Sequence, residues 1–392
     1  METEFIVKGS GGLGYRLIVF TALLVSAALL TSCSTYGNLP VPAADKAIAS
    51  ATASPAQELP ADHQEEEEEQ LLNFINTKLT GPEGVYTNLM DTDQSGEPAT
   101  GYEVLSESAS LMMRSAVLRG NQELFDKHWS IARNIFDMEG GFSYRYSPKL
   151  GKQYPVNAAV DDLRLIGALY EAGEAFADPE YSGEAARYAQ RFYDNNVIDG
   201  YLKDFYDNIY KKTNEFITLC YINLSVLQKL SIPDGLRGVL MHNMTGILEE
   251  GYLSDEFPFY ETRFDYKTGQ YSSENINTVE SLLSILNLTE MKRQNSHSIG
   301  YIREQVEAGT LYGQYTRDGQ PANEIRSTAV YALAAIIGAE AGDDSLYQAG
   351  LKRMNEFRVT DPGSPLYGGF GNPDTGEAYS FDNLMALLAY SY

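Results

Sequence analysis

One acidic residue stands at the head of an apolar segment in VLSESASLMMRSAV, residues 104–117. After Glu107, the spacing of Leu111, Met112 and Met113 is typical of a buried helix. A carboxyl group that is partly removed from water keeps its proton to higher pH, because burial disfavours the charged form. At such a position Glu107 would be able to donate a proton near neutral pH, which is the chemistry of a general acid.

Acids occupy the same place at the start of other predicted helices, directly after long loops. The set is Glu107, Asp161, Asp162, Glu215, Glu280, Glu324 and Asp382. Taken one at a time, these acids are explained by their favourable interaction with the helix dipole, about 0.3–1 kcal/mol each. Taken together under Tyr-rich loops, they would line an acidic cleft with aromatic rings. Such a cleft suits carbohydrate, because sugar CH faces stack on aromatic rings and sugar hydroxyls bond to carboxylates.

The elements that position these acids are predicted to be helices throughout. Helical spacing of apolar residues marks twelve segments, and no strand is predicted between them. A tight connection joins the two helices of each pair, and a long Gly- and Tyr-rich loop precedes the next pair, which gives a repeat of roughly 50–60 residues. The twelve segments are 65–78, 105–119, 121–136, 158–177, 182–194, 214–230, 235–250, 275–292, 297–308, 323–341, 344–357 and 381–392.

Six helix pairs are able to close on themselves. The predicted fold is therefore all-α, an (α/α)6 toroid of six inner and six outer helices with the Tyr- and Gly-rich loops on one face. The alternative is an open helical solenoid. We favour closure, because the loops vary more in length than a regular solenoid usually allows.

The N-terminus has the order of a secretory signal. Lys8 and Arg16 flank an apolar run at 17–30 that is short for a spanning helix, and LTSC follows it at 30–33. LTSC resembles a bacterial lipoprotein box, which implies cleavage after residue 32 and lipidation of Cys33. The alternative is an uncleaved membrane anchor, and both readings place the domain on the extracytoplasmic face of the cell membrane. The predicted organisation is a signal peptide at 1–32, a flexible linker at 33–64 and one domain at 65–392.

Charge and metal-ligand spacing exclude several classes of function. The 392-residue chain has a formal net charge of -25, which would repel nucleic acid. Once Cys33 is lipidated, Cys220 is the one remaining cysteine, so neither an intramolecular disulfide nor a Cys-based zinc site is possible. The four histidines lack metal-site spacing. We therefore predict no metal and no cofactor.

Two segments resemble glycoside hydrolase family 8. VLSESASLMMRSAVLRGNQELFDKHWSIAR is similar to the family's segment in which a Ser-Glu pair heads an apolar helix, and NAAVDDLRLIGALYEA is similar to its Asp-Ala-Asp-Leu helix start. The resemblance implies an (α/α)6 toroid that hydrolyses β-1,4-linked polysaccharide with inversion. It places the general acid on Glu107 and a substrate-binding acid on Asp162, beside Asp161. Val160 stands where the family has its first Asp.

The base is assigned from a weaker resemblance. ENINTVESLLSILNLTE resembles a divergent branch of family 8-like proteins associated with exopolysaccharide synthesis, and this match places the base on Glu280, with Asp162 in reserve. An inverting pair needs roughly 6.5–9.5 Å between its carboxyl groups to admit water. We expect Glu107 to be the more buried acid and Glu280 to keep solvent contact and stay ionised. Tyr206 and Asp207, in a long loop, are predicted to line the cleft.

The leading hypothesis is a lipid-anchored, endo-acting glycoside hydrolase that cleaves a β-linked polysaccharide made by the cell itself. Its partners would be the polysaccharide, the membrane through the lipid anchor, and an exopolysaccharide synthesis complex. The alternative is a non-catalytic polysaccharide-binding lipoprotein on the same fold. A polysaccharide lyase or a sugar epimerase fits less well, because an acidic cleft would repel a uronic-acid polymer.

Overall fold

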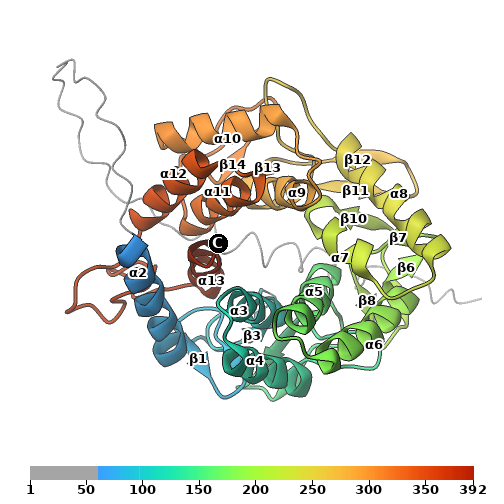
Figure 1. Ribbon diagram of the computed structural model, residues 1–392, viewed down its shortest axis with the longest axis horizontal. Coiled ribbons are helices and arrows are strands. Elements are labelled where there is room, and N and C mark those ends of the chain that lie inside the picture. Colours follow the sequence, from blue (N-terminus) through green and yellow to red (C-terminus); the bar gives the residue numbers. More distant parts are fainter. Residues whose placement is uncertain (1–60, 97) are drawn as a thin grey trace, which may run out of the picture.

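The helices of the domain form a closed ring (Figure 1). This computed structural model describes residues 61–96 and 98–392. The predicted signal peptide, the lipidated Cys33 and nearly all of the predicted linker lie outside the described residues. Within the described part of the chain, no helix is both long enough and apolar enough to cross a membrane.

Six helices form the inner ring, and all except the short α7 are buried over most of their residues. They pack against one another in chain order, and the last packs back onto the first. The first and the fourth therefore stand opposite each other. The inner helices are α3 (Ser106–Leu118), α5 (Ala159–Ala175), α7 (Leu224–Lys229), α9 (Thr278–Glu290), α11 (Thr328–Ala341) and α13 (Ser380–Tyr390).

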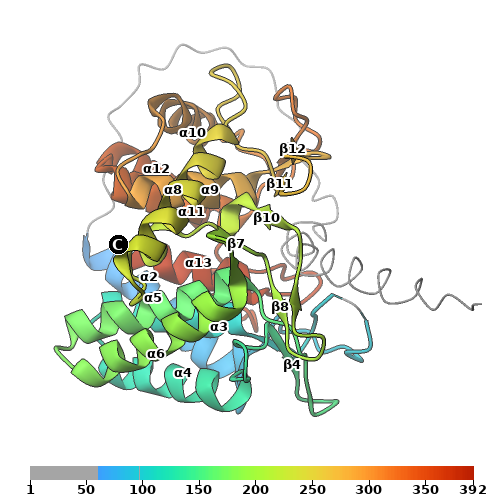
Figure 2. The same ribbon diagram turned by 90° about the vertical axis from the view of Figure 1, so that its right-hand side faces the viewer.

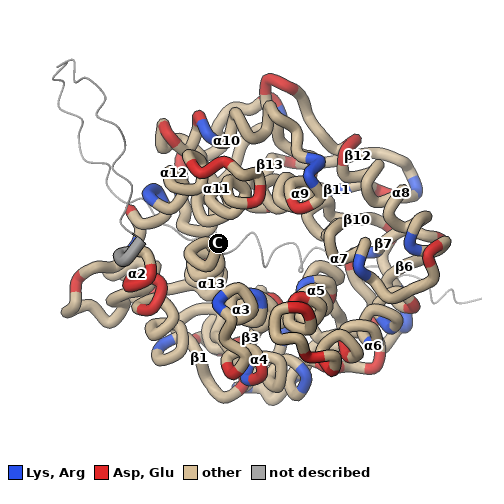
Figure 3. The backbone as a smooth tube through the Cα atoms, viewed as in Figure 1, with Lys and Arg blue, Asp and Glu red and all other residues tan. Residues whose placement is uncertain are grey.

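Six amphipathic helices form the outer wall. In α4, for example, Leu124, Phe125 and Trp129 are buried, while charged residues cover the opposite side. Figure 3 shows charged residues distributed round the outer helices and loops. The outer helices are α2 (Ala61–Phe74), α4 (Gln122–Ile135), α6 (Pro179–Asn196), α8 (Asp234–Glu250), α10 (Ser296–Ala308) and α12 (Asp344–Asn355).

The predicted all-α toroid of inner and outer helices is confirmed, with one helix much shorter than expected. The segment 214–230 is helical only over α7, because its first part forms a strand, β10 (Phe216–Thr218), and a 3-10 turn, η2 (Leu219–Tyr221). Glu215 consequently precedes a strand, and Glu324 lies in the loop before α11. Neither heads a helix as predicted. At the N-terminus, α2 begins inside the range assigned to the linker.

The long loops are built from short antiparallel strands on one side of the ring (Figure 2). Two of them, β3 and β13, run directly into α3 and α9. Every strand, like β10, is only two or three residues long, and β10 is joined by thirteen others in the described residues. They are β1 (Thr80–Gly81), β2 (Gly84–Val85), β3 (Val104–Leu105), β4 (Arg145–Ser147), β5 (Lys152–Gln153), β6 (Val197–Ile198), β7 (Tyr201–Leu202), β8 (Tyr206–Asp207), β9 (Lys212–Thr213), β11 (Arg263–Asp265), β12 (Gln270–Ser272), β13 (Ile276–Asn277) and β14 (Gln314–Tyr315).

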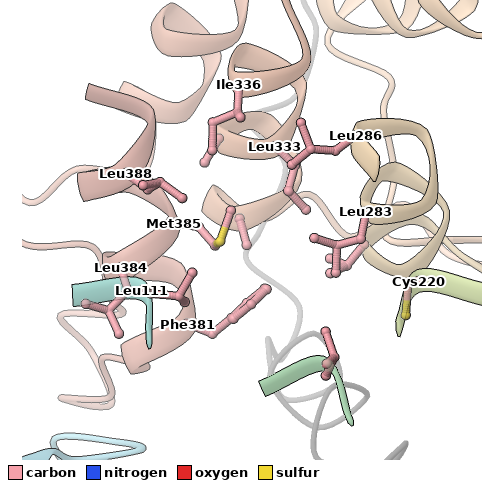
Figure 4. Packing of buried hydrophobic residues seen from close by; sticks show 14 of the residues in the cluster. Leu111, Cys220, Leu283, Leu286, Leu333, Ile336, Phe381, Leu384, Met385 and Leu388 are labelled. Atoms are coloured by element: carbon pink, nitrogen blue, oxygen red, sulfur yellow. The ribbon is translucent and has the colours of Figure 1, made fainter. Parts of the chain in front are cut away.

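The apolar core surrounds the ring axis. Figure 4 shows Leu111, Leu283, Leu333 and Met385 directed inward from four different inner helices. Because this packing holds the inner helices together along their length, it fixes the places of the residues at their N-terminal ends, where the acidic side chains lie.

Candidate active site

Glu107 is positioned by the strand that leads into its helix. In β3, Leu105 pairs with Arg145 of β4, and the Ser106 N–H donates to the Tyr144 carbonyl at 3.2 Å. A buried ion pair anchors this junction, with Arg145 Nη2 2.7 Å from Glu103 Oε2. The chain therefore enters α3 in a fixed register, and Glu107 lies in the first turn.

One guanidinium holds two acids from neighbouring inner helices. Arg164 Nη1 lies 3.2 Å from Glu107 Oε2 and 3.5 Å from Asp161 Oδ1, and the Ser106 hydroxyl donates to Asp161 at 3.1 Å. Burial raises the pKa of Glu107, and Arg164 opposes that shift. Burial and the charge of Glu107 raise the pKa of Asp161 to about 8. The pair consequently shares a proton near neutral pH.

Asp162 is used differently, although it is adjacent in sequence. Its carboxylate accepts hydrogen bonds from the Phe142 N–H at 3.1 Å and from Asn157 Nδ2 at 2.9 Å. Burial raises its pKa to about 7. These bonds tie the loop before α5 to the helix, so it is Asp161 that the structure brings to Glu107.

Glu280 begins α9, the helix opposite α3. Asn277 caps this helix, and its side-chain oxygen accepts the Glu280 N–H at 3.2 Å. Burial raises the pKa of Glu280 to about 7, against the lowering effects of Arg263 and Thr262. A pKa near neutrality suits a general base.

The expected order of burial between the two acids is wrong. Glu280 is 5% exposed and Glu107 is 9% exposed. The cause is the sheet formed by β10, β11 and β12, which brings Arg263 and the residue before it, Thr262, to the head of α9. The same loop is fixed by the Tyr260 N–H, which donates to Ser281 at 2.9 Å.

Tyr221, in the turn η2, lies near the acids of both α5 and α9. Burial raises the pKa of the Tyr221 hydroxyl well above its usual range, and the charges of Asp204, Cys220, Asp161 and Glu280 add to the shift. Tyr221 is therefore within electrostatic reach of acids from α5 and from α9. Arg164 and Cys220 also line a cavity on the ring axis with about 50 Å³ of room for water.

Tyr206 and Asp207 form part of the loop structure. Asp207 accepts the backbone N–H groups of Ile209 and Tyr210 at 2.8 and 3.0 Å, which closes the turn of the β8–β9 hairpin. The Tyr206 N–H donates to Asn157 at 2.6 Å. Through Asn157, this hairpin is linked to Asp162.

The sequence analysis did not identify three residues that lie near the acids. Arg164 had a usable signal, since it is the one cation of the inner helix α5 and lies one turn after Asp161. Tyr221 and Arg263 had none, because they belong to a turn and a strand that local patterns did not predict. Among the described residues, no three His, Cys, Asp or Glu side chains are grouped closely enough to hold a metal ion.

The arrangement provides a proton donor and a candidate acceptor on opposite inner helices. The Glu107 and Asp161 pair can donate a proton, and Glu280 can accept one. Because Glu107 and Asp161 lie 3.2 and 3.5 Å from one nitrogen, the two contacting oxygens are less than about 7 Å apart, at most near the lower end of the roughly 6.5–9.5 Å that an inverting pair requires. Glu280 lies across the ring from this pair, at the start of α9.

Comparison with known proteins finds a putative lipoprotein that matches nearly the whole chain. The chain matches no protein-family profile. It is 27% identical over 381 residues to the putative lipoprotein YdaJ of Bacillus subtilis (strain 168), covering 95% of this chain and 96% of that protein.

Several solved structures share the fold of this chain. A structure described as a novel alpha-amylase from Clostridium perfringens is 32% identical with a TM-score of 0.77, covering 83% of this chain and 97% of that one. PssZ from Listeria monocytogenes is 21% identical with a TM-score of 0.64, covering 82% and 94%. A group of glucanases and xylanases, some described as family 8 enzymes, shares the fold at 11–16% identity and TM-scores of 0.53–0.62.

Proposed function

This chain belongs to the glycoside hydrolase family 8-like proteins, and from that premise we propose that it is a lipid-anchored glycoside hydrolase acting outside the cytoplasm. The observation that carries the proposal is the pair of buried acids, Glu107 and Asp161, held on Arg164 at the loop end of the inner ring. A protonated carboxyl group in that place is what cleavage of a glycosidic bond needs. The relation to a lipoprotein supports the lipid anchor on Cys33.

In the proposed mechanism, Glu107 protonates the glycosidic oxygen and Glu280 accepts a proton from the attacking water. Water then adds to the opposite face of the sugar, so the anomeric configuration inverts. Asp161 and Arg164 set the protonation state of Glu107. Asp162, Tyr206 and Asp207 shape the loops over the cleft and, by this proposal, the substrate-binding surface.

The first candidate substrate is a β-linked polysaccharide, proposed to be β-1,4-linked, that the cell itself exports and that the enzyme cleaves within the chain. The glucanases and xylanases that share the fold support it. The second candidate is an α-linked glucan, which is favoured by the 32% identity to the protein described as an alpha-amylase. An exopolysaccharide synthesis complex is the proposed partner for the first candidate.

A non-catalytic binding lipoprotein is the competing function. It is favoured by Val160, which stands where the family's first Asp is expected, and by the Glu in place of the usual Asp at 280. Such a protein would bind the same polymers and cleave none of them.

Incubation with a panel of polymers separates these functions. The full chain and its Glu107→Gln variant are assayed for new reducing ends on amylose, cellulose oligomers, xylan and a β-1,4-linked N-acetylglucosamine polymer. We expect cleavage of one class and a rate at least about 10²-fold lower for Glu107→Gln, because the amide keeps the shape and removes the donated proton. The configuration of the product, read by NMR, tests inversion.

Three results would count against the proposal. Cleavage that is equal in Glu107→Gln would remove Glu107 from the mechanism. Full activity of Glu280→Gln would remove the base assignment alone. Tight binding without cleavage of any polymer would favour the binding lipoprotein.

A further inference from the structure

A cleft on the outer wall of the ring lies away from the acids of the inner helices. It is bounded by α8, by the β6–β7 hairpin, by β11 and by Glu215, the residue before β10. These elements lie together on the right of Figure 1. Its volume is about 690 Å³, within the range of roughly 300–1,000 Å³ that is typical of ligand pockets. We call it the α8 cleft.

Aromatic and aliphatic side chains form one part of its surface. Tyr201 is 37% exposed and meets Tyr266 edge to face, with ring centroids 5.3 Å apart. Ile198, on the same hairpin, is 44% exposed. Phe264 and Tyr266 lie on the floor. An exposed tyrosine ring beside such a floor offers a flat apolar face to a ligand.

Polar groups of mixed type form the other part. His242, Asn243 and Glu250 line the cleft from α8, and Lys203 lies 3.7 Å from Glu215 at its edge. Amide, imidazole and carboxylate groups can donate to or accept from hydroxyl groups. Acids outnumber the cations here, since Asp199 also lines the cleft. This balance disfavours an acidic polymer and suits an uncharged glycan.

A glycine keeps the cleft open. A Cβ atom at Gly246 would meet nothing within 4 Å, so the helix backbone itself forms part of the wall. Glycine in a helix interior costs about 1 kcal/mol relative to alanine, and here no close packing requires it. Gly238 has equally open surroundings on the same helix but lies outside the cleft.

The cleft is connected to the candidate active site through one strand. Successive residues of a strand point to opposite faces. Phe264 of β11 lines the cleft, as does Tyr266, the residue after the strand ends, whereas Arg263 of the same strand acts on the carboxyl group of Glu280. The two sites therefore use opposite faces of the same strand.

We propose that the α8 cleft is a second binding site for an uncharged segment of the polysaccharide, in which a sugar ring stacks on Tyr201 and its hydroxyl groups bond to side chains of α8. The proposal rests on the proposed function, because it takes a glycan as the ligand. The site holds the polymer to the protein while the active site acts on another segment.

The first test measures the number of ligands bound. In the Glu107→Gln background, calorimetric titration of the full chain with maltohexaose, cellohexaose and chitohexaose should show two binding events per chain for one of the three. Gly246→Leu in that background should show one, because the side chain fills the cleft. Gly238→Leu is the matched control and should keep two. Both leucines should raise rather than lower the melting temperature, since each replaces a helical glycine in open space.

The second test uses the tyrosine ring. Tyr201→Ala should weaken the second binding event about fivefold, within the range expected for loss of one aromatic contact. Tyr201→Phe should change it by less than about twofold, because the stacking face remains. On the polymer, both Gly246→Leu and Tyr201→Ala should raise KM and leave kcat unchanged.

The proposal is overturned if Gly246→Leu and Gly238→Leu bind the same number of ligands, or if none of the three oligosaccharides gives a second event. Failure of the proposed function is read separately. Absence of hydrolysis by the unmutated chain would remove the catalytic role, while the difference between the two leucine variants would still report the cleft.

Discussion

The guanidinium of Arg164 determines how many protons the acids of the inner ring hold. It lies between Glu107 and Asp161, and its charge lowers the pKa of each carboxyl group against the raising effect of burial. Since the two acids are close together, ionising one makes ionising the other harder. The two acids therefore titrate as a pair. In the proposed mechanism, the last proton that the pair holds is the one donated to the glycosidic oxygen.

Replacing Arg164 should consequently move the pH dependence of hydrolysis. In Arg164→Gln the lowering charge is lost, so the pair keeps its proton to higher pH and the alkaline limb of kcat/KM should move up by about one pH unit or more. Initial rates from pH 5 to 10 measure the shift. Arg187→Gln removes the same charge from an exposed site on α6 and should leave the limb in place. If the alkaline limb of kcat/KM does not move in Arg164→Gln, the pair of Glu107 and Asp161 does not supply the proton.

At the scale of elements, contacts between α11 and α12 depend on two glycines. A Cβ atom at Gly350 would lie 2.8 Å from the backbone of Ala335, and one at Gly338 would lie 2.5 Å from the Tyr347 nitrogen. The two helices thus approach more closely than any side chain would permit. This approach brings the outer wall onto the inner ring at α11.

Alanine at these positions should destabilise the domain although alanine is the better helix former. Gly350→Ala and Gly338→Ala force backbone to move, so the free energy of unfolding should fall by about 1–3 kcal/mol. Gly300→Ala on α10, where a Cβ atom meets nothing within 4 Å, should instead raise it by up to about 1 kcal/mol. Urea unfolding of the three variants measures these differences. Equal stability of Gly350→Ala and Gly300→Ala would show that the helices can separate without cost.

At the scale of the whole molecule, buried acids link stability to pH. Burial raises the pKa of Asp162 and Glu280 to about 7 and that of Asp204 and Asp382 to about 6. In the unfolded chain these groups titrate near pH 4. Between about pH 4 and 7 the folded state therefore binds more protons than the unfolded state, and stability falls as pH rises through this window.

The melting temperature should accordingly be higher at pH 5.5 than at pH 8. The measurement is a series of thermal melts in 0.5 M salt, which screens the exposed part of the net charge of -25 more than the buried groups. Asp382→Asn keeps an oxygen that can accept the Ala329 N–H and removes one titrating group, so its slope should be shallower. A melting temperature that is flat or rises from pH 5.5 to 8 would contradict the raised pKa values of these buried acids.

The periodicity of apolar residues in the sequence was sufficient to predict the helices and their arrangement in inner and outer pairs. The inner helices are apolar nearly all round and the outer ones are amphipathic, and both patterns are local properties of the chain. The position of Glu107 in the first turn of an inner helix follows from its few neighbours in sequence. Local patterns failed for the segment 214–230, because β10 forms by pairing with β11, a strand that lies far along the chain.

Which side chains meet was decided only by the tertiary structure. Asp161 and Asp162 look alike in the sequence, yet a rotation of one residue round α5 turns Asp161 toward Arg164 and Glu107 and Asp162 toward Phe142 and Asn157. The burial of Glu280 likewise depends on a sheet folded over α9. A sequence pattern fixes which face of a helix is buried, but the partner of Asp161 comes from a helix 55 residues earlier in the chain, and only the packing of α3 against α5 brings the two together.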